Sequence, residues 1–121
     1  MTVTTVVLTG PNGEYDWTWM SGSSTVNGAL TGLYGTGYGS VGTPEGRLWP
    51  AMWTDSAGNL WLFGGGDINW NYFNDLWEYN PAANQWIWMN GPNVTNDPGS
   101  FGALGQFAPG NNPPSRMMAA K

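Results

Sequence analysis

Oxygen-bearing side chains recur between residues 67 and 78 at the spacing of a twelve-residue calcium loop. They fill positions 1, 3, 5, 9 and 12 of such a loop, in the order Asp67, Asn69, Asn71, Asp75 and Glu78. Tyr72 stands at the sixth position, however, where the turn requires glycine, and no helix-forming sequence flanks the segment. We therefore predict no metal site, and calcium binding by this loop stays the open alternative.

Aromatic and amide side chains in the first half of the same segment indicate a different chemistry. Indole and phenol rings can stack on sugar faces, and asparagine amides both donate and accept hydrogen bonds. We predict that this loop contacts a glycan or protein ligand through Asp67, Asn69, Trp70, Asn71 and Tyr72. The alternative is that Trp70 and Tyr72 pack against a neighbouring part of the same assembly.

Residues that most enzymes depend on are missing from the chain. There is no histidine and no cysteine, which excludes imidazole bases, thiol nucleophiles and metal sites built from those ligands. Carboxylates are present at Glu14, Asp16, Asp67, Asp75 and Glu78, but no spacing selects an acid and base pair for glycoside hydrolysis. We predict a non-catalytic protein without a cofactor, and a glycan-active enzyme ranks behind the binding interpretations.

Composition indicates one ordered all-β domain. The chain has 121 residues, a net charge of -5, 9% charged residues and 15% aromatic residues, which argues against nucleic-acid binding and against disorder. Nineteen glycines and 9 prolines interrupt any helical pattern. No apolar run approaches the roughly 20 residues of a membrane span, and the N-terminus lacks the charged start of a signal peptide. Low charge favours an extracellular or secreted location.

The chain repeats itself at a spacing of 69 residues. Trp17 and Trp86 match at this spacing, and so do Arg47 and Arg116. At the same spacing the segment 6–9 aligns with 75–78, whereas Tyr34-Gly35 aligns with Phe101-Gly102 at a spacing of 67. The sequence therefore contains about one and three-quarter copies of one unit.

Alternating apolar residues between turn signals predict four short strands in the middle of the chain. They cover 48–54, 59–63, 75–79 and 85–89, and short turns at 55–58 and 80–84 join the first to the second and the third to the fourth. Tryptophan and leucine occur on both faces of this antiparallel meander. A sheet that is apolar on both faces must be covered on both, as the blades of a propeller are.

The residues of this central unit resemble a kelch repeat, in the bacterial style of the galactose oxidase central-domain superfamily. The resemblance covers residues 47–89 and rests on six positions: Arg47 and Arg116 before a first strand, Gly64 and Gly65 after the second, Tyr79 in the third and Trp86 in the fourth. It implies structural roles for these six residues. The copper chemistry of galactose oxidase does not carry over, because it needs histidine and cysteine.

The resemblance implies an all-β fold: a kelch-like four-stranded antiparallel blade with parts of the two neighbouring blades, in a β-propeller or propeller-like assembly. The expected divisions are the last strands of a preceding blade (1–20), a long loop (21–46), a complete blade (47–89), a second long loop (90–112) and the first strand of the next blade (113–121). The expected function is a binding or scaffold module that self-associates as a homo-oligomer or joins the remaining blades of a longer chain. The alternative is a structural subunit of an extracellular polymer assembled by strand exchange.

Overall fold

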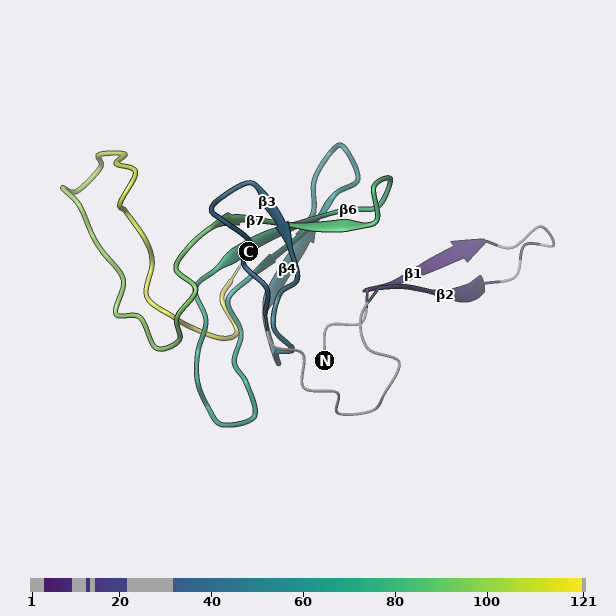
Figure 1. Cartoon of the computed structure of the whole chain (residues 1–121), viewed down its shortest axis with the longest axis horizontal. Coiled ribbons are helices and arrows are strands. Elements are labelled where there is room, and N and C mark those ends of the chain that lie inside the picture. Colours follow the sequence, from purple (N-terminus) through teal and green to yellow (C-terminus); the bar gives the residue numbers. More distant parts are fainter. Residues whose placement is uncertain (1–3, 10–12, 14, 22–31, 121) are drawn as a thin grey trace.

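The fold is all-β, as the sequence predicts. The computed structural model describes residues 4–9, 13, 15–21 and 32–120, and none of these residues is helical. Within these residues the strands are β1 (Thr4–Thr9), β2 (Tyr15–Ser21), β3 (Ser40–Gly42), β4 (Ala51–Thr54), β5 (Leu60–Phe63), β6 (Leu76–Asn80) and β7 (Gln85–Asn90). β1 and β2 form a hairpin, and the others form one antiparallel sheet in the order β3-β7-β6-β5-β4 (Figure 1).

The four-stranded meander is present as β4 to β7, with one boundary moved. The first strand was predicted over 48–54, but β4 begins at Ala51. Trp49 has a left-handed φ of 51°, which breaks the extended conformation just before Pro50. Leu48 instead exchanges backbone hydrogen bonds with Gly66, at 2.7 and 2.9 Å. The start of the predicted strand is therefore a separate bridge across the end of the sheet.

Two segments differ from the expected divisions. The segment 21–46 was predicted as a loop, but Ser40–Gly42 inside it is the outer strand β3, paired with β7. Residues 113–121 were expected to begin a next blade, and no strand is assigned within 113–120. At the 69-residue spacing, 113–119 correspond to 44–50, which lie before β4 and contain no strand either, so the counterpart of β4 would begin only at Ala120.

The β1-β2 hairpin repeats the register of the β6-β7 hairpin. Thr4 pairs with Ser21 as Leu76 pairs with Asn90, and both hairpins have an irregularity directly after this pair. This register places Thr4 72 residues before Leu76, so the predicted alignment of 6–9 with 75–78 is wrong by three residues. The β1-β2 hairpin has one more residue in each strand than the β6-β7 hairpin, and its connection, 10–14, is one residue longer than 81–84; together these account for the three residues.

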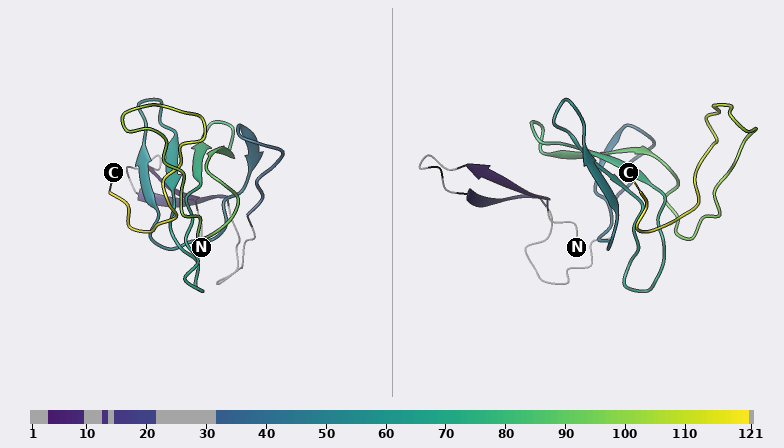
Figure 2. Two further views of the ribbon diagram at one scale, coloured as in Figure 1. Left: turned by 90° about the vertical axis from the view of Figure 1, so that its left-hand side faces the viewer. Right: turned by 180° about the vertical axis from the view of Figure 1, so that it is seen from behind.

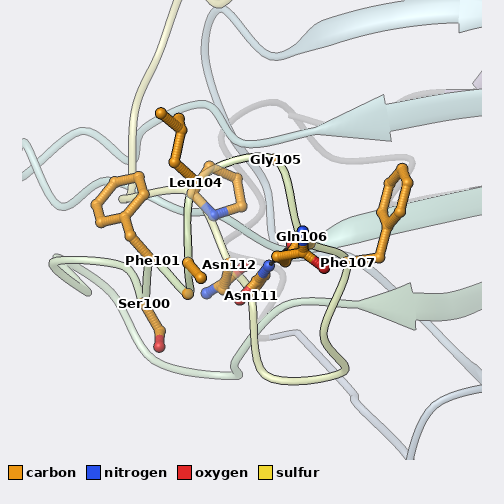
Figure 3. A pocket seen from close by; sticks show the side chains of 11 residues that line it. Ser100, Phe101, Leu104, Gly105, Gln106, Phe107, Asn111 and Asn112 are labelled. Atoms are coloured by element: carbon orange, nitrogen blue, oxygen red, sulfur yellow. Dashed lines mark hydrogen bonds between the residues drawn. The ribbon is translucent and has the colours of Figure 1, made fainter.

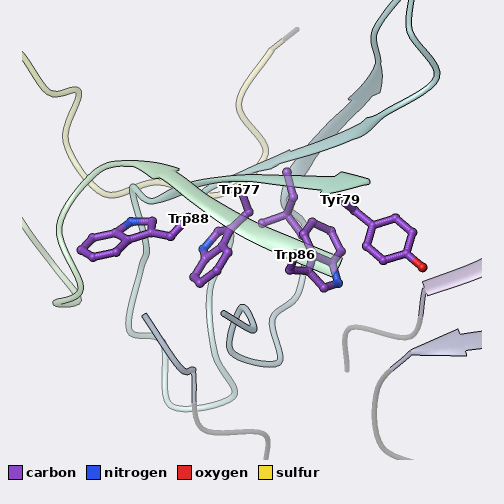
Figure 4. Close-up of a cluster of buried hydrophobic side chains, with 5 residues drawn as sticks. Trp77, Tyr79, Trp86 and Trp88 are labelled. Carbon is purple, nitrogen blue, oxygen red and sulfur yellow. The ribbon is translucent and has the colours of Figure 1, made fainter. Parts of the chain in front are cut away.

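One face of the sheet carries the core. Five buried side chains form it: Leu62, Trp77, Tyr79, Trp86 and Trp88. Figure 4 shows the aromatic members along one side of the strands. The loop before β3 covers part of this face, with the Tyr34 ring centroid 5.2 Å from that of Trp77 and 4.9 Å from that of Trp88. Aromatic contacts in this geometry add about 0.5–1.5 kcal/mol each to the burial of apolar area.

The opposite face of the sheet is apolar and partly open. Trp53 on β4 stacks on Trp61 on β5 with ring centroids 6.0 Å apart and an interplanar angle of 5°. Trp53 remains 37% exposed, and Val41 on β3 is 56% exposed. The prediction that both faces carry large apolar side chains is therefore correct, whereas the described residues cover one face much more than the other.

A buried ion pair joins the loop before β4 to the loop before β6. Arg47 and Asp75 are 4% and 0% exposed, and the guanidinium binds both carboxylate oxygens, with Nη2 2.9 Å from Oδ2. Trp77 Nε1 and the Tyr34 hydroxyl also donate to Oδ2, at 2.6 and 2.7 Å. Arg47 further donates to the carbonyl oxygen of Gly64 at 3.0 Å. Every charge buried here has a partner, which offsets the cost of desolvation.

Tyr34 makes the stability of this arrangement sensitive to alkaline pH. Burial, followed by the nearby Asp75 carboxylate, raises the pKa of the Tyr34 phenol well above its usual value of about 10. The stabilisation from the neutral phenol is therefore complete below about pH 10 and is lost as the pH rises further, because the unfolded chain ionises first. Burial raises the pKa of Tyr79 in the same direction.

We predict that the free energy of unfolding falls above about pH 10 and falls less steeply in Tyr34→Phe, which has one fewer titrating group. Urea unfolding followed by tryptophan fluorescence, at intervals between pH 7 and 11.5, measures both slopes. An identical slope in the two proteins would contradict the role given to Tyr34.

Candidate functional site

The candidate site is the loop between β5 and β6, at the opposite end of the sheet from the β4-β5 and β6-β7 turns (Figures 1 and 2). Gly64 and Gly65 lead into it with left-handed φ values of 64° and 101°. A Cβ atom at Gly64 would lie 2.5 Å from the carbonyl oxygen of Arg116. Glycine is therefore required here both for the backbone conformation and for the close approach of the C-terminal segment.

The Asp67 carboxylate holds the loop closed from inside. Its Oδ1 accepts hydrogen bonds from the backbone amides of Asn69 and Asn71 at 2.8 and 2.9 Å, and its Oδ2 accepts from the Asn71 side chain at 2.8 Å. The Asn71 amide is the main cause that lowers the pKa of this carboxyl. Asp67 and Asn71 are therefore occupied within the loop.

The turn at 55–59 is closed by an aspartate in the same way. Asp55 Oδ1 accepts from the backbone amides of Ala57 and Asn59 at 2.9 and 3.0 Å, and the bond from Trp61 Nε1 is the main cause that lowers the Asp55 pKa. The fourth residue has a left-handed φ in both loops. It is Gly58 with φ 87° in the turn, and Trp70 with φ 64° in the candidate site.

Trp70 therefore occupies a position that its own side chain disfavours. A left-handed conformation costs a non-glycine residue about 1–2 kcal/mol, and the turn at 55–59 avoids this cost with Gly58. The Trp70 side chain is 63% exposed, so burial does little to compensate. Backbone strain at an exposed aromatic residue is a physical reason to look for function at this residue.

A second loop fixes the outer side of the site. Asn96 Oδ1 accepts from the backbone amide of Tyr72 at 2.9 Å, and Asn96 Nδ2 donates to Asn71 Oδ1 at 3.1 Å. The backbone amide of Asn96 donates to the carbonyl oxygen of Tyr72 at 2.8 Å. Sequence reasoning missed Asn96, since its segment contains several asparagines and no pattern distinguishes this one.

The five predicted ligand-binding residues thus divide into two groups. Asp67, Asn71 and the backbone of Tyr72 build the loop, whereas Asn69 and Trp70 face solvent. Ile68, which the sequence analysis did not select, is 84% exposed beside them. The exposed surface of the loop is a short ridge, Ile68-Asn69-Trp70, with two apolar side chains and one amide.

The carboxylates of the calcium-like spacing do not converge. Asp75 is buried against Arg47, and the Asp67 oxygens already accept bonds from the loop. Among the described residues, no group of three or more acidic, histidine or cysteine side chains is placed to hold a metal ion.

The residues given structural roles lie around the core and the loop end. Tyr79 is fully buried and donates its hydroxyl hydrogen to Asn84 Oδ1 at 2.6 Å, and Trp86 is 7% exposed. Arg47 is buried in the ion pair. Arg116, to which the resemblance also gives a structural role, is exposed, and its Nε donates to the carbonyl oxygen of Pro114 at 3.0 Å.

Comparisons of the chain with protein-family models, curated protein sequences and solved structures found no match. Within the described part of the chain, no helix is long and apolar enough to cross a membrane.

We predict that Trp70→Gly raises the free energy of unfolding by up to about 1 kcal/mol, because glycine adopts the left-handed conformation without steric cost. Gly58→Ala in the matching turn is expected to lower it by a similar amount. Urea unfolding of the three proteins measures both changes. A Trp70→Gly protein that is less stable than the parent would show that the indole ring stabilises the fold.

Proposed function

We propose that the chain is a non-catalytic carbohydrate-binding module of the kelch-type β-propeller kind, acting outside the cytoplasm, with the Ile68-Asn69-Trp70 ridge as its contact surface. The observation that carries the proposal is Trp70 next to Asn69: an exposed indole at a strained backbone position stands beside an exposed side-chain amide, on a loop closed by its own hydrogen bonds. Binding to a preorganised loop avoids the entropy cost of ordering it.

The chemistry of the ridge favours a sugar ligand. An exposed indole offers a flat apolar face, and the neighbouring Asn69 amide can both donate to and accept from hydroxyl groups. Asp67 and Asn96 hold the loop from two sides, so the backbone that carries the ring is fixed by contacts within the chain. Protein ligands, the other class expected from the sequence, would use the two apolar side chains more than the amide.

The non-catalytic part of the proposal rests on how the aspartates are used. Asp55 and Asp67 each accept several hydrogen bonds within their own loops, and Asp75 is buried in the ion pair with Arg47. A carboxylate engaged in this way is poorly placed to transfer a proton to a substrate.

The propeller part of the proposal rests on the meander and on its open face. β4 to β7 form four consecutive antiparallel strands, and Trp53 and Val41 lie exposed on the face opposite the core. Covering that face with a neighbouring sheet would remove the exposed apolar area from water.

A glycan array followed by titration calorimetry tests the binding proposal. We predict that the protein binds at least one glycan on the array. Trp70→Ala is expected to weaken the affinity for that glycan tenfold or more, which is about 1.4 kcal/mol. Trp49→Ala is the matched control, because Trp49 is also exposed and also has a left-handed φ, whereas its neighbours Leu48 and Pro50 offer no side-chain amide to a sugar. Equal binding by the parent and Trp70→Ala, or capture of peptides and not glycans, would contradict the proposal.

A further inference from the structure

The segments 100–112 and 33–43 are closed by the same pattern of backbone hydrogen bonds. Leu33 and Thr43 exchange two backbone hydrogen bonds of 2.8 and 2.9 Å, and Ser100 and Asn112 exchange two of 2.8 Å. An aromatic residue and a glycine follow the first member of each pair. Both segments are therefore loops closed at the same two points, and the second is longer by two residues.

The match continues into the residues after each loop. Arg47 Nε donates to the carbonyl oxygen of Glu45, and Arg116 Nε donates to that of Pro114, both at 3.0 Å. Two residues later, Trp49 and Met118 have almost equal left-handed φ values of 51° and 52°. The 69-residue repeat is thus a repeat of backbone conformation here, in addition to a repeat of residue type.

The first copy of this loop is docked on a sheet. Tyr34 and Tyr38 both pack on Trp88, with centroid distances of 4.9 and 4.8 Å. Ser40–Gly42 adds strand β3 to β7, and the Arg47 guanidinium ends on the Asp75 carboxylate. A loop of this kind therefore supplies three things to a sheet: aromatic contacts, an outer strand and a cation.

The second copy, unlike the first, is not packed on a sheet in the described part of the chain. Its two aromatic residues, Phe101 and Phe107, are 77% and 106% exposed. Figure 3 shows them on opposite sides of a hollow. The hollow is open, has a volume of about 530 Å³ and is lined by residues of this loop. The loop projects from the sheet in Figures 1 and 2. Among the described residues, no carboxylate forms an ion pair with Arg116.

The base of this second loop is nevertheless fixed. The backbone amide of Arg116 donates to the carbonyl oxygen of Phe73 at 2.9 Å, that of Gly65 donates to the carbonyl oxygen of Arg116 at 2.9 Å, and that of Met118 donates to the carbonyl oxygen of Trp49 at 3.0 Å. The loop is therefore presented in a defined direction from the end of the sheet.

We propose that segment 100–118 is the docking half of a joint between repeat units, and that its partner is another unit of this same repeat. Phe101 and Phe107 take the places of Tyr34 and Tyr38 on the partner's tryptophan. The Arg116 guanidinium pairs with the carboxylate that stands where Asp75 stands in this unit. The positive charge left on Arg116 and the apolar area of the two phenylalanines are the two features that such a partner complements.

A chain extended by one repeat tests this joint. It consists of residues 1–120 followed by a second copy of residues 52–120, which continues the 69-residue spacing and supplies a second Asp75. In this protein we expect Arg116→Ala to lower the urea midpoint as much as Arg47→Ala does, whereas in the 121-residue chain Arg116→Ala leaves the midpoint unchanged. Backbone amides of 100–112 are expected to exchange at least tenfold more slowly in the extended chain.

Leu104 provides the matched control for the aromatic contacts. It is fully exposed and lies in the part of the loop where the two extra residues fall, so Leu104→Ala should leave the midpoint of the extended chain unchanged while Phe101→Ala lowers it. The proposal would be overturned if the appended copy of residues 52–120 stays unfolded in the extended chain, or if Arg116→Ala has no effect on its midpoint. Neither result depends on ligand binding by Trp70.

Discussion

The loop end of this protein depends on the buried contact between Arg47 and Asp75. The guanidinium joins the segment before β4 to the carboxylate before β6 and to the carbonyl oxygen of Gly64. Tyr34 and Trp77 complete the carboxylate shell from the covering loop and from the core. Losing one partner would leave a buried charge unpaired, which typically costs about 3–5 kcal/mol, a large part of the stability of a small domain. The candidate site lies between Gly64 and Asp75, so this pair fixes both ends of its loop.

The strands of the central sheet could be predicted from the sequence, because alternating apolar residues and turn residues are local signals. β5, β6 and β7 each lie within one residue of their predicted bounds. β3 was missed because Ser40–Gly42 is short and glycine-rich and becomes a strand only by pairing with β7. The predicted alignment of β1 was wrong by three residues because β1 contains no tryptophan or glycine that would mark its register. In β2 and β7, Trp17 and Trp86 mark the register.

The candidate site was predicted as a set of residues but not as a geometry. Adjacency in the sequence was enough to group the residues from Asp67 to Tyr72. It did not show that Asp67 and Asn71 are used up within the loop or that Asn96 reaches it across 25 positions. Nor did it show that Trp70 takes the place that Gly58 fills in the matching turn. The site therefore combines two physical features, a loop closed by hydrogen bonds within the chain and a strained, exposed indole at its tip.

A double-mutant cycle with Arg47→Met and Asp75→Leu tests most directly whether the ion pair organises the loop end. Each single change leaves one buried charge without its partner, whereas the double change removes both. We predict that the double variant loses about 2–3 kcal/mol less unfolding free energy than the sum of the two single losses. Losses that add within about 0.5 kcal/mol would contradict it, since independent residues behave additively.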